Sequence, residues 1–398
     1  MAHAELVPGV YWTGIVDWNV RTFHGYTYTT PRGSTYNAYL IIDDKITLID
    51  AVFGPFADEF IARIAGVVDP SKIDYIIVNH VETDHSGALP RLLALCPKAK
   101  LFATSRGKDS LMRIYHKSWD VETVKTGDSL SLGKRSLAFL EAPMVHWPDS
   151  MFSYCPQEKI LFSNDAFGQH YASSERFDDQ TDQGALHDEA KKYYANILWP
   201  FGSVIAKKID DIGKEGLDIR TIAPSHGIIW RKDPAWVLDA YRRWAREETR
   251  SKVVIAYETM WGSTSLMARA IAQALTEAGI EVKLYDVALT DRTQIITQML
   301  DARGFVFGSS THDNVMLPTM AALLHFLGGL RPHNRFGCAF GSYGWAGGAV
   351  KEIEDHMRSC GIEVAQPAVS VRYVPDEKTL SECAAFGKSF AEKIRAET

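Results

Sequence analysis

Cysteine is scarce in this sequence and widely scattered. The 398 residues include five cysteines, and no two of them form a C-x-x-C pair: Cys96, Cys155, Cys338, Cys360 and Cys383. Close cysteine pairs form the knuckles that hold a single iron ion, and clustered cysteines hold iron–sulfur clusters, so neither redox centre is expected within this sequence. Dispersed thiols are typical of reducing compartments, and the odd number argues against a disulfide framework. We therefore expect a cytoplasmic protein.

Long apolar runs and a strong charge of one sign are also absent. No apolar stretch of about 18 residues occurs, so no membrane-spanning helix is expected. The N-terminal residues lack a basic stretch followed by an apolar run, and we expect no signal peptide. The net charge of −6 gives no indication of a nucleic-acid or membrane surface. The length favours two domains of an ordinary globular protein.

Short apolar segments alternate with helical ones in the first part of the chain. Strands are expected at residues 9–16, 36–42, 46–52, 73–79, 159–163 and 221–223. Helices are expected at residues 55–64 and 89–95. Apolar residues are continuous from Tyr75 in the segment 73–79, which predicts a strand that is buried on both faces.

A second pattern begins after a helical stretch at 234–250 that ends in a charged run. Strands are expected near 253–258, 282–286, 304–309, 336–341 and 369–373, with helices between them. Regular alternation of this kind predicts a five-stranded, doubly wound parallel sheet. We therefore place the domains at 1–250 and 251–398.

Metal-ligand side chains are concentrated directly after the strand at 73–79. The segment 80–85 contains His80, Glu82, Asp84 and His85. Burying such a group without a metal would cost several kcal/mol, on the order of the usual desolvation penalty, although a solvated turn is an alternative. Three more candidates follow apolar segments: His146, Asp165 and His226. Each of these alone is more often an ordinary hydrogen-bonded loop residue.

The order H-x-E-x-D-H … H … D … H resembles the metallo-β-lactamase superfamily, whose fold is an αβ/βα sandwich. Glu82 stands where that superfamily usually has a second histidine. A carboxylate at this position shifts the preference from zinc towards iron. This variant, followed by a flavodoxin-like half, resembles the flavodiiron proteins over essentially the whole chain.

The resemblance implies two non-haem iron ions for each chain. His80, Glu82 and His146 would hold one ion, Asp165 would bridge, and the other ion would be held by Asp84, His85 and His226. It also suggests that His24 and Tyr193 line the gas pocket, where a role as packed or surface loop residues is equally open.

Three loops of the second part are candidates for flavin binding. The first follows the T-x-x-G-x-T pattern, in which hydroxyls and N–H groups at a helix N-terminus can hold a phosphate. It consists of Thr259, Met260, Trp261, Gly262, Ser263 and Thr264. The second consists of Ser310, Thr311, His312, Asp313 and Asn314. The third consists of Ser342, Tyr343, Gly344, Trp345, Ala346 and Gly347. Because no G-x-G-x-x-G fingerprint is present, FMN is favoured over FAD.

The expected function is reduction of O2 to water, of NO to N2O, or of both, with electrons that pass through FMN. Since the sequence has no C-x-x-C pair, the donor is expected to be a separate carrier, and the resemblance implies rubredoxin. The resemblance also implies a head-to-tail homodimer, alone or as a dimer of dimers. Two alternatives are open: a dinuclear zinc hydrolase with a fused flavodoxin-like domain, and an electron carrier with a vestigial metal domain.

Overall fold

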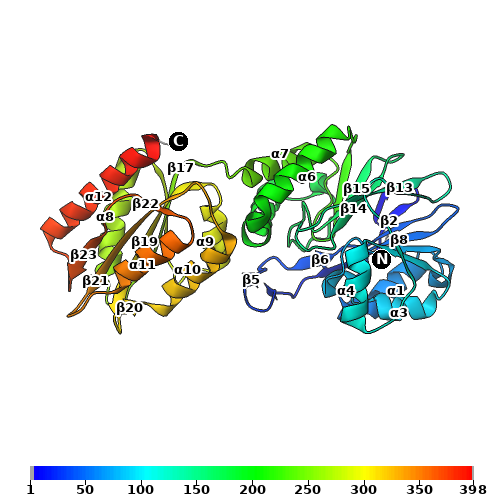
Figure 1. Ribbon diagram of the computed structural model, residues 1–398, viewed down its shortest axis with the longest axis horizontal. Coiled ribbons are helices and arrows are strands. Elements are labelled where there is room, and N and C mark those ends of the chain that lie inside the picture. The colour runs from blue at the N-terminus through cyan, green and yellow to red at the C-terminus, as the bar shows by residue number, and fades with distance from the viewer. Residues whose placement is uncertain (1–3, 397–398) are drawn as a thin grey trace. The chain divides into compact units, whose positions relative to one another are not determined.

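The computed structural model describes residues 4–396, which form two compact units (Figure 1). The first unit contains the chain up to Tyr193 together with Ser203–Arg242. The second contains Tyr194–Gly202 and the chain from Arg243 onward. The last division between the two units lies between Arg242 and Arg243, a few residues before the expected boundary at residue 250. Arg250 is the first residue of strand β17 (Arg250–Glu258). The boundary at residue 250 stays a prediction about the domains.

Two large sheets form the core of the first unit. One has the order β1 (Ala4–Val7), β2 (Val10–Trp12), β7 (Tyr39–Ile41), β8 (Thr47–Ile49), β9 (Tyr75–Ile77), β10 (Lys100–Ala103) and β11 (Val121–Thr123). The other has the order β12 (Ser129–Ser131), β13 (Ser136–Glu141), β14 (Met151–Cys155), β15 (Ile160–Asn164) and β16 (Thr221–Pro224). One core contains residues of both sheets, such as Ile77 and Phe162, so the sheets pack face to face as a sandwich.

Strands β8 and β9 are buried on both faces, and for β9 this confirms the prediction from its continuous apolar residues. Ile49 and Ile77 belong to the core between the sheets, whereas their neighbours Leu48 and Ile76 belong to a second core. Residues of α1 (Ala57–Ala65) and α3 (Leu89–Leu95) contribute to that second core. Because successive side chains of a strand point to opposite faces, a helix layer must cover the outer face of this sheet.

Several candidate ligands closely follow the ends of strands β9, β15 and β16. β15 and β16 are parallel, with Asn164 opposite Pro224, so the residues after them emerge at one edge of their sheet. β9 ends shortly before His80, and Met151 of the other sheet donates its N–H to the carbonyl of Asn79 at 2.9 Å. That hydrogen bond joins the two sheets beside the ligand segment.

The second unit is built on a largely parallel sheet. Its order is β18 (Glu281–Asp286), β17, β19 (Ala302–His312), β21 (Phe336–Tyr343) and β22 (Glu363–Val364). The strand expected near 369–373 is β23 (Val369–Arg372), and it pairs with the second part of β21, whereas the additional β22 pairs with the first part. The short β20 (Val315–Met316) adds an antiparallel pair with β19. The doubly wound parallel sheet is thus confirmed.

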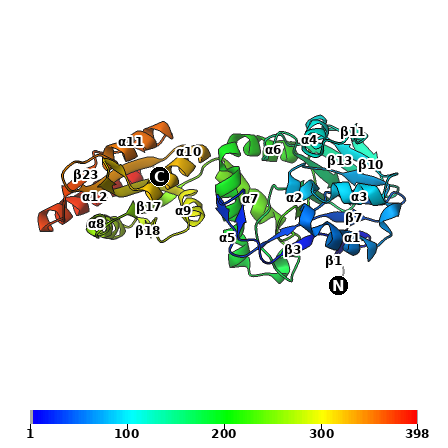
Figure 2. The same ribbon diagram turned by 90° about the horizontal axis from the view of Figure 1, so that it is seen from below.

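Helices cover both faces of this sheet. α8 (Ser263–Glu277) packs with α12 (Glu377–Ala396), and α10 (Pro318–Leu330) packs with α11 (Ala349–Ser359). Figure 2 shows α10 and α11 on the face opposite to α8. Within residues 4–396, no helix combines the length and the apolarity needed to cross a membrane.

Two expected elements were wrong in their extent. The segment 9–16 forms two strands rather than one, because β3 (Ile15–Asp17) leaves the first sheet to pair with β6 (Ser34–Tyr36). The chains pass so closely there that a Cβ at Gly14 would lie 2.3 Å from the carbonyl oxygen of Tyr36. The helix expected at 234–250 ends earlier, as α7 (Pro234–Ala245), since Arg250 already belongs to β17.

Candidate metal centre and flavin site

All seven metal-ligand candidates come together in the first unit. They form two groups in which the potential ligand atoms lie within 4.8 Å of one another. One group consists of His80, Glu82, His146 and Asp165, and the other of Asp84, His85 and His226. The sequence therefore identified every member of a convergent cluster, although their role as ligands stays a prediction.

The two carboxylate oxygens of Asp165 face different groups. Oδ2 lies 3.2 Å from Nε2 of His146 and 3.6 Å from Nε2 of His80. Oδ1 lies 2.9 Å from Nε2 of His85 and 3.7 Å from Nε2 of His226. A single carboxylate thus contacts both histidine groups, which is the placement that a bridging ligand requires.

The short helix α2 (Thr83–Ser86) divides the 80–85 segment between the groups. Glu82 precedes the helix, and its Oε2 lies 3.4 Å from Nε2 of His80. Asp84 is inside the helix, and its Oδ2 lies 3.2 Å from Nε2 of His226. The turn is held by Ser86, whose hydroxyl donates to the carbonyl of Val81 at 2.7 Å.

Two histidines are oriented by groups outside the cluster. Nδ1 of His80 donates to Oδ2 of Asp149 at 3.0 Å, and Nδ1 of His226 donates to the carbonyl of Thr35 at 2.6 Å. These contacts leave Nε2 of both rings to face the cluster, and such contacts usually fix the orientation of metal-binding histidines. No motif in the sequence points to Asp149 or Thr35.

The electrostatics of the cluster fit a pair of cations. Burial by itself would raise the pKa of Asp165, but the neighbouring imidazoles of His85 and His146 outweigh burial and hold it well below its usual value. Burial would lower the pKa of His80, but hydrogen bonds to Asp149 and Glu82 raise it. Buried Oδ1 of Asp84 and Oδ2 of Asp165 have no hydrogen-bond partner among the described residues. Four imidazoles and three carboxylates, without a thiolate, form a donor set that suits iron.

His24 and Tyr193 lie on different sides of the cluster. Nε2 of His24 is 3.5 Å from Oε1 of Glu82, and the hydrogen bond to this carboxylate raises the pKa of His24. The ring of Tyr193 is buried with its centroid 6.2 Å from that of His226, and burial raises the pKa of its phenol. Both residues are therefore near the candidate metal centre, although their roles stay predictions.

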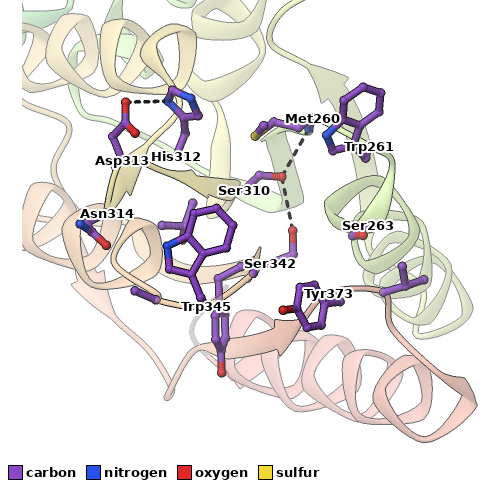
Figure 3. A pocket seen from close by; sticks show the side chains of 15 residues that line it. Met260, Trp261, Ser263, Ser310, His312, Asp313, Asn314, Ser342, Trp345 and Tyr373 are labelled. Atoms are coloured by element: carbon purple, nitrogen blue, oxygen red, sulfur yellow. Dashed lines mark hydrogen bonds and ion pairs between the residues drawn. The ribbon is translucent and has the colours of Figure 1, made fainter.

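A cavity of about 660 Å³ lies at the carboxyl ends of the strands of the second unit (Figure 3). Thirteen of the predicted flavin-binding residues line it: Met260, Trp261, Ser263, Ser310, Thr311, His312, Asp313, Asn314, Ser342, Tyr343, Gly344, Trp345 and Ala346. Trp261 and Trp345 enter from different loops and are 90% and 89% exposed. Large exposed aromatic side chains beside a cavity are typical of a site that a planar ligand covers.

The other predicted flavin-binding residues lie outside this lining. The hydroxyl oxygen of Thr259 accepts the N–H of Gly262 at 3.1 Å, and this bond closes the turn that begins α8. The hydroxyl of Thr264 shares hydrogen bonds with Ser310 at 3.0 Å and Ser342 at 2.9 Å. Gly347 is the last of the predicted flavin-binding residues that do not line the cavity. Tyr373 and Val374, which the sequence analysis missed, line the cavity because β23 ends at the same edge of the sheet.

Two family descriptions match the chain in succession. The ODP family of β-lactamases matches residues 35–227, and the flavodoxin family matches residues 255–387. Fold and site thus define a protein in which a β-lactamase-type domain precedes a flavodoxin domain.

Relatives with the same architecture cover almost the whole chain. The nitric oxide reductase of Moorella thermoacetica is 52% identical over 98% of each chain. The anaerobic nitric oxide reductase flavorubredoxin of Pectobacterium atrosepticum is 42% identical over 96% of this chain and 76% of its own length. Among solved structures, the rubredoxin oxygen:oxidoreductase of Desulfovibrio gigas has a TM-score of 0.97 and 39% identity, covering 100% of this chain and 99% of its own. This chain belongs to the flavodiiron protein family.

Proposed function

We propose that this protein is an oxidoreductase that reduces NO to N2O, O2 to water, or both, at a pair of iron ions, with electrons supplied through FMN. The observation that carries the proposal is the position of Asp165, whose two oxygens face the two histidine–carboxylate groups. The cavity in the flavodoxin domain supports the electron-transfer part. The names of the related reductases support the choice of substrates.

When bound, the iron pair would supply the redox chemistry at the gas and FMN would supply the electrons. His80, Glu82 and His146 would hold one ion, Asp84, His85 and His226 the other, and Asp165 both. Asp149 and Thr35 keep the rings of His80 and His226 in orientation for this task. A fixed donor geometry of this kind reduces the rearrangement needed during turnover.

Tyr193 and His24, which lie beside the candidate metal centre, would hold protons for the reaction. Because its phenol has a raised pKa, Tyr193 stays protonated at neutral pH and can donate a hydrogen bond from its hydroxyl. His24 has a raised pKa, which favours a proton on Nε2 at the Glu82 side. Both residues could therefore offer hydrogen to the oxygen of a reacting gas.

In the second unit, the turn at Gly262 would receive the phosphate of FMN, and Trp261 and Trp345 would flank its ring. The N-terminus of α8 favours an anion there.

The electron donor would be a separate carrier such as rubredoxin, and the working assembly a head-to-tail homodimer or a dimer of dimers in the cytoplasm. The donor is supported by the name of the D. gigas oxidoreductase. The dimer rests on the resemblance to the family and is testable by sedimentation analysis.

The two alternatives have less support. The named relatives are gas reductases, which does not favour a zinc hydrolase. A vestigial metal domain would not be expected to retain seven converging ligand candidates. Metal analysis of purified protein, followed by an anaerobic assay with reduced rubredoxin and each gas, tests the proposal. Consumption of neither gas by a sample loaded with iron and FMN would refute it.

A further inference from the structure

A second cluster of buried polar side chains lies beside the candidate metal centre. It is formed by the loop at 28–34, by His170 and by helix α5 (Gln183–Tyr193). Glu189, Lys192 and Tyr193 lie on one face of this helix, since their spacing is i, i+3 and i+4. The helix therefore places a carboxylate, an ammonium group and the phenol of Tyr193 together.

Glu189 is at the outer end of the cluster. Its Oε1 lies 3.2 Å from Nε of Arg32, and the side chain of Arg32 is 49% exposed whereas that of Glu189 is 8% exposed. Oε2 of Glu189 is buried and has no hydrogen-bond partner among the described residues. Carboxylates are rarely buried unless they are fully paired or serve a function, so this half-paired one requires an explanation.

Lys192 and Tyr28 connect this end with the interior. The ammonium group of Lys192 donates to the carbonyl of Thr29 at 2.7 Å and lies 5.3 Å from the centroid of the Tyr28 ring. The Tyr28 ring is in turn 5.1 Å from the ring of His170. Together with the i, i+3 placement of Glu189 and Lys192 on the helix, these contacts lead from Arg32 at the surface to His170.

His170 is at the inner end. Its Nδ1 shares a hydrogen bond of 2.7 Å with the hydroxyl of Ser34. Its ring centroid is 5.2 Å from that of Tyr193 and 4.8 Å from that of His226. Nε2 of His170, like the hydroxyl of Thr30, is buried and has no hydrogen-bond partner among the described residues.

Buried polar groups without protein partners usually bind ordered water. Three such atoms occur in this small region: Oε2 of Glu189, Oγ1 of Thr30 and Nε2 of His170. Water molecules between them would connect the carboxyl group of Glu189 with the side of the metal centre on which Tyr193 lies. The geometry thus resembles a proton path more than a structural ion pair.

We propose that Glu189 passes protons from the solvent beside Arg32 to the metal centre, through water molecules that end at Tyr193. This inference rests on the proposed function, because reduction of either gas forms water and consumes protons. In each transfer the carboxyl group of Glu189 would release its proton towards the metal centre, where reduction of the gas consumes protons and the iron pair and FMN would supply the electrons. The carboxylate then takes a proton from bulk water. Glu189 therefore acts through the water molecules and Tyr193, and it does not contact the gas.

The charges around Glu189 are suited to this role. Burial raises the pKa of its carboxyl group, while the cations Lys192 and Arg32 lower it and Asp188 on the same helix raises it. The net effect is a raised pKa, which makes it easier for the carboxylate to take up a proton again after each transfer. If the protonated form is needed, turnover falls as the pH rises through this pKa.

The test compares Glu189→Gln, Glu189→Asp and, as a control, Asp188→Asn at the adjacent position. Each protein is loaded with iron and FMN, and stopped-flow measurements follow reduction of FMN by the donor and its reoxidation by gas. For Glu189→Gln we expect a fall in kcat of at least about tenfold, an unchanged KM for the gas, unchanged FMN reduction and loss of the high-pH decline. Glu189→Asp should restore part of the rate. Asp188→Asn should keep the kcat of the wild type below the pH of the decline, with the decline itself moved slightly to lower pH because one charge that raises the pKa of Glu189 is lost.

A second readout does not depend on turnover. Infrared spectra of the protein without metals, recorded over a pH series, should contain the carbonyl band of a protonated carboxyl group at pH values at which an exposed glutamate is already ionised. The band should vanish in Glu189→Gln and persist in Asp188→Asn. The proposal is overturned if Glu189→Gln keeps the kcat and the pH profile of the wild type, or if both Glu189 variants lose iron equally. A wild-type protein that consumes neither gas would instead overturn the proposed function itself.

Discussion

Asp165 presents Oδ1 to Nε2 of His85 at 2.9 Å and keeps Oδ2 for the other histidine group. Because this carboxylate contacts both groups of candidate ligands, Asp165→Ala should lose metal from both sites. Asp84→Ala should mainly lose the metal that is held with His85 and His226. Iron per chain, measured by plasma mass spectrometry, distinguishes the two variants. Two ions retained by Asp165→Ala would show that this residue is not the bridge.

Asp149 should control metal affinity without being a ligand. It accepts hydrogen bonds from Nδ1 of His80 and from the N–H of Val81. Loss of such a partner typically weakens metal binding by about 10–100-fold. We expect this for Asp149→Asn in chelator competition. Asp178→Asn is the matched control, since Asp178 is a buried carboxylate that accepts N–H groups such as those of Arg231 and Lys232. Equal losses of metal affinity would contradict the assignment.

Gly262 should control FMN retention and leave the metals unaffected. Its φ is +92°, and a Cβ there would meet nothing within 4 Å, so substitution strains only the backbone. In Gly262→Val the strain of about 1–2 kcal/mol would reshape the turn that begins α8. Gly279, with φ +77° and equally open surroundings after the other end of α8, provides the control. We expect Gly262→Val to release FMN, as measured by fluorescence, whereas Gly279→Val should only lower stability.

Trp261 and Trp345 should matter for flavin binding and little for folding. Because both are about nine-tenths exposed, replacement by alanine should change the free energy of unfolding of the FMN-free protein by less than about 0.5 kcal/mol. Loss of one aromatic contact, worth about 0.5–1.5 kcal/mol, should weaken FMN binding up to roughly tenfold. Leu289→Ala removes another exposed apolar side chain and should leave the Kd for FMN unchanged. An unchanged Kd in both tryptophan variants would place the flavin elsewhere.

The sequence revealed the candidate ligands because their chemistry is concentrated. His80 to His85 come directly after a strand whose apolar run marks it as buried, and the rigid end of such a strand sets the direction of the next residues. Thr35 could not be found in this way, because it contacts His226 through a backbone carbonyl that any residue would supply. Asp149 looks like an ordinary turn residue until its 3.0 Å contact with His80 is known.

Long-range pairing explains the remaining differences. Tyr373 lines the flavin cavity only because β23 pairs with the second half of β21, and no local pattern specifies that register. The interruption of the strand at Gly14 depends on the close approach of the Tyr36 backbone. Tyr36 lies about twenty residues later in the chain and reaches Gly14 because β6 pairs antiparallel with β3. Similarly, the segment Tyr194–Gly202 joins the second unit although it lies far from that unit in sequence. Its docking uses Asn196, which donates to the carbonyl of Thr293 at 3.1 Å.

The most direct test of the central claim is gas turnover by protein of known metal content. Protein purified without oxygen, analysed for iron and zinc and loaded with FMN, is mixed with reduced rubredoxin and either NO or O2, while mass spectrometry follows the gases. We predict two iron ions per chain and formation of N2O from NO, disappearance of O2 without release of peroxide, or both. Zinc in both sites, or consumption of neither gas by the iron-loaded protein, would contradict the claim.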